Sequence, residues 1–258
     1  MSPRRADSAV ARLLAPLAGS LWTVFVIWSG FVAVIWTTGW GETHLAAHVR
    51  NPELRDALAW LLRALDAIWL TLGAVSVYFA LVRAEGIEVA RRWSAIALLV
   101  GLLIHGASAR TDWPLGPVHY TSSLGMKLGP VPSALPVLWL FIVVGARDLA
   151  QVVLPRASHG ATALLAGGIA LLTDVNLEPL AWEWRVWWLW YPEGVAAPSR
   201  PPLQNYATWL LAGAALAYAM RSPRVLPRLR RRPFEPIAAL AILNAVCLLT
   251  HAALFVRR

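Results

Sequence analysis

Several long runs of apolar residues follow one another along the chain, and they restrict it to the class of membrane proteins. A helix needs about 20 predominantly apolar residues to span the hydrocarbon core of a bilayer. The composition agrees, because 58% of the residues are hydrophobic and only 14% are charged, whereas soluble domains carry a charged fraction of about one quarter. We therefore predict an all-α, polytopic integral membrane protein, with residues 1–258 forming a single transmembrane domain.

The number of apolar runs predicts a bundle of about seven transmembrane helices, with a Trp-rich interfacial or re-entrant segment between helices five and six. The third, fourth and sixth runs are short, so their helices should extend into the flanking Trp and Pro residues. In the second run, Arg63 and Asp66 lie one turn apart and can pair on a helix face. An amphipathic first turn at the membrane interface is the simpler interpretation of these two residues. The seven runs are Leu17–Thr38, Leu58–Val82, Trp93–Ser108, Leu135–Gly145, Gly160–Asn176, Tyr206–Met220 and Ile237–Val256.

The distribution of basic residues predicts the orientation in the membrane. Lys and Arg concentrate in short loops on the cytoplasmic side. The basic tail (residues 1–16) and the loops after the second, fourth and sixth spans hold most of the Lys and Arg residues. We expect a protein of the cell membrane with a cytoplasmic N-terminus, an outer C-terminus and no cleaved signal peptide. The net charge of +9 then reflects topology and attraction to anionic membrane lipid, and we expect no nucleic acid partner for the Arg cluster at 221–232.

The loops after the first, third and fifth spans share the other face of the membrane, and they gather most of the ionisable side chains outside the basic loops. Two of these loops bear the motifs discussed below, at residues 109–130 and 177–205. His105 and His251 lie in the same half of the bilayer. Ionisable groups in or beside membrane spans are costly and usually functional, so we predict a composite site at this face. The loop residues are Glu42, His44, His48, Asp112, His119, Tyr120, Asp174, Glu178 and Glu183.

The stretch DVNLEPLAWEWRVWWLWYPEGVAAPSRPPLQNY (174–206) combines acids with tryptophans. Asp174 and Glu178 lie four residues apart at the end of the fifth apolar run. The helix dipole and partial burial both disfavour a charged carboxylate there, as a proton donor requires. The simpler alternatives are a solvated loop acid for Glu178, an interfacial belt for the tryptophans, or a helix lying flat in the interface. The five tryptophans are Trp182, Trp184, Trp187, Trp188 and Trp190.

Histidines offer two weaker hypotheses for cofactors. His44 and His48 are four residues apart and could hold a metal if that loop is helical, but no clear third ligand follows. His105 and His251 could ligate a haem between helices, although histidines that only pack between helices are more common. A retinal protein is excluded, because Lys127 is the only lysine and lies in a loop. A secondary transporter would show internal repeats, which we do not find, and Cys247 is expected to be an inert core residue.

Four ordered elements resemble the membrane carotenoid-biosynthesis proteins of the CruF type, which are carotenoid hydratases related to bisanhydrobacterioruberin hydratase. The resemblance covers roughly residues 105–210, and outside that region only the hydropathy is similar. The elements are TDWPLGPVHYT (111–121), LGMKLGPVPSALPVLWLFIVV (124–144), DVNLEP (174–179) with WEW (182–184), and PLQNYATW (202–209).

The resemblance implies a hydratase that adds water across the terminal carbon–carbon double bond of an acyclic carotenoid, with no cofactor and no metal. Asp174 and Glu178 would act as acid and base, supported by His105. Aromatic rings would stabilise a carbocation, each desolvated contact contributing up to about 2 kcal/mol. The implied partners are a lipophilic carotenoid, membrane lipid and other enzymes of the carotenoid pathway. The expected substrate-binding residues are Trp113, His119, Tyr120, Trp182, Trp184, Asn205 and Trp209.

The chain departs from the family pattern at several of these positions. His105 stands where the pattern has Glu, and Glu178 stands where it has Asp. An imidazolium is an acid of pKa about 6.5, so His105 could donate a proton or relay one from Asp112. Two alternatives to the hydratase stay open at this point: a membrane protein that binds a carotenoid or a partner helix without catalysis, and a haem or metal protein.

Overall fold

Each of the seven apolar runs forms an α-helix in the computed structural model, and the part of the chain that the structure describes holds seven α-helices, as predicted. The structure describes residues 3–40, 48–191, 200–220 and 233–257, with side chains described from residue 16 onward. Within these ranges the helices are α1 (Pro3–Thr38), α3 (Pro52–Glu85), α4 (Ile87–Thr111), α5 (Ala134–Val153), α6 (His159–Pro179), α7 (Leu203–Ala219) and α8 (Glu235–Arg257).

The helices have the lengths and surfaces of a multi-pass membrane protein. Five of them (α1, α3, α5, α6 extended by the turn that follows it, and α8) are long and apolar enough to cross a bilayer. Large apolar side chains also cover the outside of the bundle, where a soluble protein would place polar groups. Four examples from different helices are Ile27, Leu172, Leu211 and Leu248, which are 61–69% exposed.

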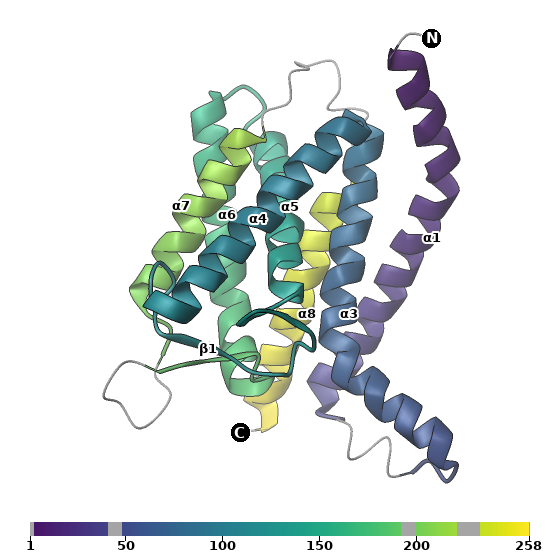
Figure 1. Ribbon diagram of the computed structural model, residues 1–258, viewed down its shortest axis with the longest axis vertical. Helices are drawn as coiled ribbons and strands as arrows, with labels where there is room; N and C mark the ends of the chain where they lie inside the picture. Colours follow the sequence, from purple (N-terminus) through teal and green to yellow (C-terminus); the bar gives the residue numbers. More distant parts are fainter. Residues whose placement is uncertain (1–2, 41–47, 192–199, 221–232, 258) are drawn as a thin grey trace.

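Consecutive helices run in opposite directions, so the two chain ends lie at opposite ends of the bundle (Figure 1). The segments after α4 and α6 therefore lie at the same end as the C-terminus, as the predicted topology requires. The N-terminal tail differs from expectation. Residues 3–16 were predicted as a tail outside the first span, but they continue α1 as one helix with Pro16 inside it. Alanine and arginine, which are frequent there, are good helix formers.

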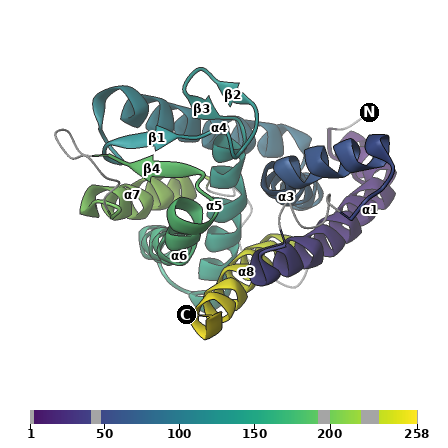
Figure 2. The same ribbon diagram turned by 90° about the horizontal axis from the view of Figure 1, so that it is seen from below.

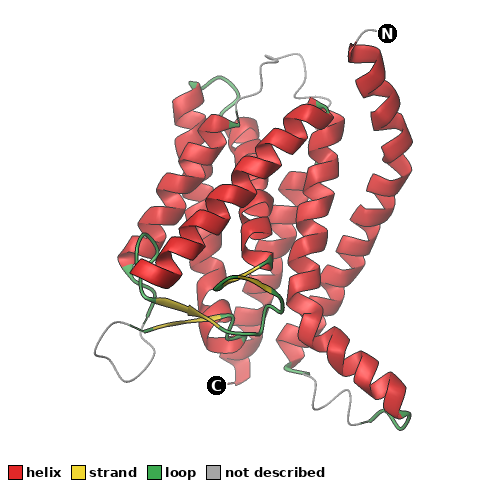
Figure 3. Cartoon of the chain, in the orientation of Figure 1, coloured by secondary structure: helices red, strands yellow, loops and turns green. Residues whose placement is uncertain are grey.

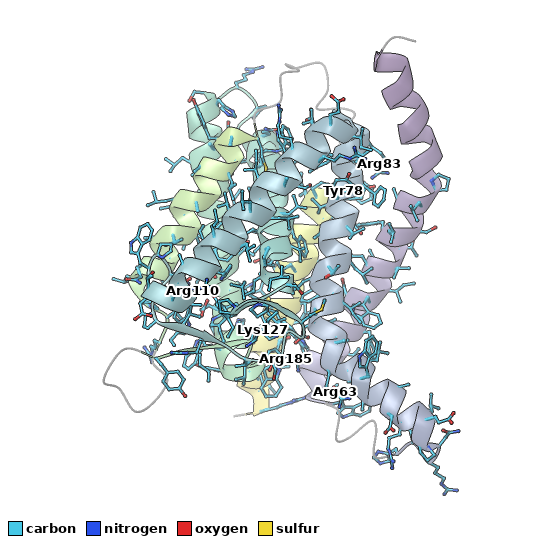
Figure 4. The ribbon with its side chains drawn as sticks, in the orientation of Figure 1. Arg63, Tyr78, Arg83, Arg110, Lys127 and Arg185 are labelled. Carbon is cyan, nitrogen blue, oxygen red and sulfur yellow. The ribbon has the colours of Figure 1, made fainter. Side chains whose placement is uncertain are left out.

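Helix α5 forms the centre of the core and packs against α3, α4, α6, α7 and α8 (Figure 2). Its mid-section is buried on all sides, which explains why this helix is apolar around its whole circumference. At the end near the N-terminus, Arg147 of α5 pairs with Asp148 and stacks on Trp93. Arg83 of α3 pairs with Glu235 of α8 at the same end, opposite to Lys127 and Arg185 (Figure 4).

Short strands close the other end of the bundle (Figure 3). Strand β1 (Val118–Tyr120) pairs antiparallel with β4 (Trp188–Trp190), and β2 (Lys127–Leu128) pairs with β3 (Val131–Pro132). We call the pair β1–β4 the ribbon, and this side of the bundle the ribbon end. The predicted motif loops are thus largely structured, because α4 runs to Thr111 and α6 continues into the π-helix η1 (Leu180–Trp184).

The Trp-rich segment does not form the flat interfacial helix that its spacing suggested. After η1 the chain extends and becomes β4, with Tyr120 opposite Trp188 and Val118 opposite Trp190. Trp187, Trp188 and Trp190 are almost fully buried, so the interpretation of these three rings as an interfacial belt is wrong. Alternation along a strand turns Trp188 and Trp190 to the same face, and that face covers the end of α6.

A close approach between α6 and α7 brings two parts of the site together. A Cβ at Gly167 would lie 2.4 Å from the carbonyl oxygen of Leu210 and 2.8 Å from Cβ of Ala214. Only glycine allows the two backbones to approach so closely, as is common between membrane helices. The N-terminal turn of α7, which carries Asn205, consequently lies against the C-terminal half of α6.

Candidate active site

Two carboxyl groups are buried side by side near the end of α6. Asp174 and Glu178 are each only 1% exposed, and they lie within hydrogen-bonding reach of each other. Their spacing of four residues places both on one face of the helix. The interpretation of Glu178 as a solvated loop acid is therefore wrong, because the helix continues to Pro179 and the side chain points into the bundle.

Three neutral groups donate hydrogen bonds to this pair. The indole Nε1 of Trp188 lies 2.8 Å from Oε1 of Glu178, and that of Trp190 lies 2.6 Å from the same oxygen. The side-chain nitrogen of Asn205 lies 2.9 Å from Oδ2 of Asp174 and 3.5 Å from Oε2 of Glu178. The two indoles come from the ribbon and Asn205 from α7, so three separate elements assemble the site.

This arrangement holds a proton between the two acids. Two buried carboxylates within hydrogen-bonding reach cannot both ionise unless a cation compensates them. Glu178 accepts the two indole N–H bonds and therefore carries the negative charge more readily. Asp174 accepts one bond from Asn205, and its Oδ1 is buried with no N–H or O–H donor among the described side chains. Asp174 is thus the better holder of the shared proton, which hydrogen-bonds to Glu178.

His105 approaches this pair through Tyr120. Nε1 of Trp139 donates to Nε2 of His105 over 3.0 Å, and Nδ1 of His105 lies 2.6 Å from the hydroxyl of Tyr120. Because the indole only donates, Nε2 must be unprotonated and the ring neutral, with its proton on Nδ1 directed at Tyr120. The predicted imidazolium is therefore not compatible with this geometry. The Tyr120 hydroxyl keeps its own proton for another acceptor.

Tyr120 belongs to the ribbon and lies outside the membrane-spanning helices. Burial, and next the nearby charge of Glu178, raise the pKa of its phenol well above the ordinary value. The indole rings of Trp139 and Trp209 stack in parallel with 4.1 Å between their centroids, so the predicted residue Trp209 supports the partner of His105.

A second buried carboxylate was not predicted as part of a site. Asp66 of α3 is 1% exposed and accepts hydrogen bonds from Nε of Arg185 (2.8 Å), Nε1 of Trp187 (2.8 Å) and Nε1 of Trp36 (3.0 Å). It is not part of an amphipathic turn at the interface, and its partner comes from the Trp-rich segment rather than from its own helix. An acid within an apolar run was the available sequence signal, but nothing near it in the sequence indicated Arg185.

Several predicted residues lie away from the carboxyl pair. Trp113 is 71% exposed, so its ring does not lie in the buried site, and its assignment to the substrate pocket stays a prediction. His119 is exposed and contacts the ring of Tyr191, because its neighbours Val118 and Tyr120 take the inward positions of β1. Asp112 is exposed as the C-cap of α4, about two helical turns beyond the buried His105.

The structure gives no support to the histidines that were considered as ligands of a haem or a metal ion. Both ring nitrogens of His105 are engaged, as described above, which leaves none to ligate a haem iron. His251 directs Nε2 at the carbonyl oxygen of Asn176 over 2.8 Å. No group of three or more His, Cys, Asp or Glu among the described residues is arranged to hold a metal ion. Glu42 and His44 lie outside the described residues.

A cavity of about 790 Å³ lies at the ribbon end, between the end of α6, η1 and the last turns of α8. Pro179 and Leu180, which directly follow Glu178, form one wall, and the half-buried Trp184 lines it as well. The half-buried Trp182 lies two residues after Leu180 in the chain. The cavity and the carboxyl pair thus share one turn of the chain, but neither Asp174 nor Glu178 lines the cavity.

Comparison with known proteins agrees with the resemblance seen in the sequence. Residues 65–257 match the model of the family described as carotenoid biosynthesis protein. A bisanhydrobacterioruberin hydratase of Haloarcula japonica is 36% identical over 108 residues, which covers 41% of this chain and 36% of that relative. No solved structure matches the chain. Because the family match spans well over half of the sequence, the chain belongs to the carotenoid biosynthesis protein family.

Proposed function

We propose that this protein is a carotenoid hydratase, which adds water across the terminal carbon–carbon double bond of an acyclic carotenoid. The observation that carries the proposal is the buried pair Asp174–Glu178, bound only by neutral donors and covered by indole rings. Membership in a carotenoid biosynthesis family and similarity to a protein named as a hydratase support the same class of reaction.

The residues fit an acid-catalysed addition in which one acid donates and the other accepts a proton. The carboxylic acid of Asp174 transfers its proton to the less substituted alkene carbon, and the π electrons form the new C–H bond. The resulting tertiary carbocation is attacked by a water oxygen, and the released proton goes to Glu178. Transfer of that proton from Glu178 to Asp174 through their hydrogen bond restores the starting state, so the net change is alkene plus water to tertiary alcohol.

The surroundings of the pair suit this reaction. Burial keeps the acid in a medium with little water, where the proton is not lost to solvent. The rings of Trp188 and Trp190 can stabilise a nearby cation, with about 0.5–2 kcal/mol for each contact. Asn205 contacts both carboxyls and fixes their relative position. Because both acids are covered, an alkene reaches them only when the covering side chains move.

Expression in a bacterial host that accumulates lycopene tests the proposal. The expected result is a pigment heavier by one water for each reacted end, with the new oxygen derived from labelled water. Asp174→Asn should reduce the rate by at least about 100-fold while the protein still folds and binds pigment. The matched control is Asp56→Asn, whose side chain is 81% exposed and whose loss should leave the rate unchanged.

The same experiment separates the hydratase from a protein that binds carotenoid without converting it. Unchanged pigment masses with lycopene and with other acyclic carotenoids, despite pigment bound to the purified protein, would favour the binding function. An equal rate for wild type and Asp174→Asn would contradict the role of this acid even if product forms.

The orientation in the membrane is part of the proposal. The basic loops favour a cytoplasmic N-terminus in the cell membrane, which places the ribbon end and the carboxyl pair in the outer half of the bilayer. Reporter fusions at the two chain ends test this, because a reporter active only in the cytoplasm should work at the N-terminus alone.

A further inference from the structure

Three ring side chains form a hydrogen-bonded chain that runs from the core of the bundle to the ribbon. Trp139 of α5 is fully buried and donates its indole N–H to Nε2 of His105 in α4 over 3.0 Å. On the other side of the imidazole, Nδ1 lies 2.6 Å from the hydroxyl of Tyr120 in β1. The proton transfers proposed above between the alkene and the two acids use none of these three side chains.

The order of donors and acceptors in this chain fixes the direction of the Tyr120 hydroxyl. An indole nitrogen can only donate, so Nε2 of His105 accepts and the proton of the neutral ring lies on Nδ1. The N–H group at Nδ1 then donates to the phenol oxygen, and the phenol directs its own proton to a further acceptor. With the opposite tautomer, Nδ1 would accept and Tyr120 would donate its proton to His105 instead.

Close packing holds the core side of this chain in place. The ring of Trp139 stacks in parallel on that of Trp209, with 4.1 Å between their centroids. A Cβ at Gly101 would lie only 2.7 Å from Cδ1 of Trp139, so a glycine is needed where the indole meets α4. His105 follows Gly101 by one turn on the same face of the helix. Its side chain is 4% exposed, which keeps bulk water from competing for Nε2.

The other end of the chain lies beside the carboxyl pair. Tyr120 is directly opposite Trp188 in the ribbon, and opposite residues place their side chains on one face, with Cβ atoms about 4.5–5.5 Å apart. On that face the indole of Trp188 donates to Glu178. Burial, and after it the charge of Glu178, raise the pKa of the Tyr120 phenol, which agrees with a position near the carboxylate.

We propose that Tyr120 donates this hydrogen bond to the oxygen atom that is added to the alkene, and that Trp139 and His105 are positioning residues that direct it there. The inference rests on the proposed function and adds to it a place for the water. The phenol keeps its proton throughout. It binds the oxygen of the attacking water and then that of the tertiary alcohol, while Glu178 takes the proton that the water releases. A water held in place captures the carbocation before the cation loses a proton and returns to alkene.

Hydration of lycopene in deuterated water by the purified full-length protein tests the inference. Capture of the cation gives alcohol, whereas return to the alkene leaves deuterium in the recovered substrate, so the ratio of the two products measures capture. Tyr120→Phe should lower the rate of alcohol formation by about fivefold, the contribution of one neutral hydrogen bond, and should raise the ratio of deuterated alkene to alcohol. A change that only disturbed the fold would lower both products together.

Trp139→Phe tests the positioning role, because it removes the indole N–H and no longer fixes the proton of His105 on Nδ1. We expect alcohol formation to fall by up to about fivefold, with no further loss when Tyr120→Phe is already present. Nitrogen NMR with isotope-labelled histidine should show the proton of His105 on Nδ1 in the wild type and on both nitrogens in the variant. Trp93→Phe is the matched control, because Trp93 is equally buried and its Nε1 has no hydrogen-bond partner among the described residues.

Losses from Tyr120→Phe and Trp139→Phe that add in the double variant would overturn the inference, and so would an unchanged ratio of deuterated alkene to alcohol in Tyr120→Phe. A proton on Nε2 of His105 in the wild type would overturn it even if Trp139→Phe fails to fold. Failure of the proposed function looks different: the wild type would then form neither alcohol nor deuterated alkene, which overturns both. Normal hydration by wild type and Tyr120→Phe alike overturns the inference alone.

Discussion

Two buried carboxylate sites lie at the same end of the bundle, and the same short segment serves both. Arg185 and Trp187 bind Asp66, whereas Trp188 and Trp190 bind Glu178. Both sites lie in apolar surroundings and both use indole N–H donors. They differ in charge, because the single acid of the first site meets a guanidinium and the two acids of the second meet only neutral groups.

That difference in charge gives the two sites different roles, because the first only fixes the segment in position and the second can react. At Asp66, three donors and one positive charge complete the requirements of an ionised carboxylate, so nothing is left to react. At the pair Asp174–Glu178, the charge of one acid can be tolerated only if the other keeps a proton. The segment between Arg185 and Trp190 therefore fixes its position at one site and places its donors at the other.

The largest expected effect of changing one of the two carboxylate sites is on the rate of the proposed hydration. Glu178→Gln keeps an oxygen that can accept the two indole N–H bonds but removes the base and the charge. We expect the hydration rate to fall by about 10²–10⁴-fold, with thermal unfolding in detergent nearly unchanged. Asp66→Asn should show the opposite pattern, with lower stability and a smaller loss of rate per folded molecule. Similar stability losses in both variants would mean that the two sites do not differ in charge as described.

The second-largest expected effect is on the free energy of unfolding alone. Arg185→Met leaves the carboxylate of Asp66 buried without its cation, which typically costs about 3–5 kcal/mol. We expect a value near the lower limit, because the side chain of Arg185 is 23% exposed. The matched control is Arg55→Met, whose pair with Asp56 is exposed on both sides and should contribute about 0–1 kcal/mol. Denaturant titrations of both variants measure the difference, and equal losses would show that Asp66 does not depend on a cation.

The sequence predicted those parts of the molecule that local patterns determine. The seven helices follow from runs of apolar residues, and the proximity of Asp174 and Glu178 follows from their spacing on one helix. The antiparallel order of the helices follows because each predicted span crosses the bilayer once, and it correctly placed the motif segments at one end.

The parts that the sequence did not predict depend on contacts between distant residues. Asp66 and Arg185 are 119 positions apart, and the ribbon joins residues 118–120 to residues 188–190. The sequence also does not show whether a given tryptophan is exposed or buried. Trp113 and Trp188 both lie in the motif-bearing segments, yet the first is 71% exposed and the second 4%. Only the pairing of the strands turns Trp188 inward.

The smallest expected effect uses Tyr120 to report on the charge of the neighbouring pair. Burial and the charge of Glu178 raise the pKa of this phenol in the folded protein, whereas an unfolded chain releases the proton near pH 10. The folded protein thus binds more protons than the unfolded chain above about pH 10, so stability should fall as the pH rises, by up to about 1.4 kcal/mol per pH unit. Tyr120→Phe should lose this component, while Tyr218→Phe, at a side chain 56% exposed, should retain it.

Combining this measurement with Glu178→Gln sharpens the comparison between the sites. Removing the charge of Glu178 leaves the burial of Tyr120 in place, so the loss of stability above pH 10 should become smaller but persist. Removing the charge of Asp66 should leave it unchanged, because Asp66 already has Arg185 as its counter-ion. An alkaline response that is identical in wild type and Glu178→Gln would indicate that Glu178 is neutral in the folded protein, and Asp174 would then have to carry the negative charge.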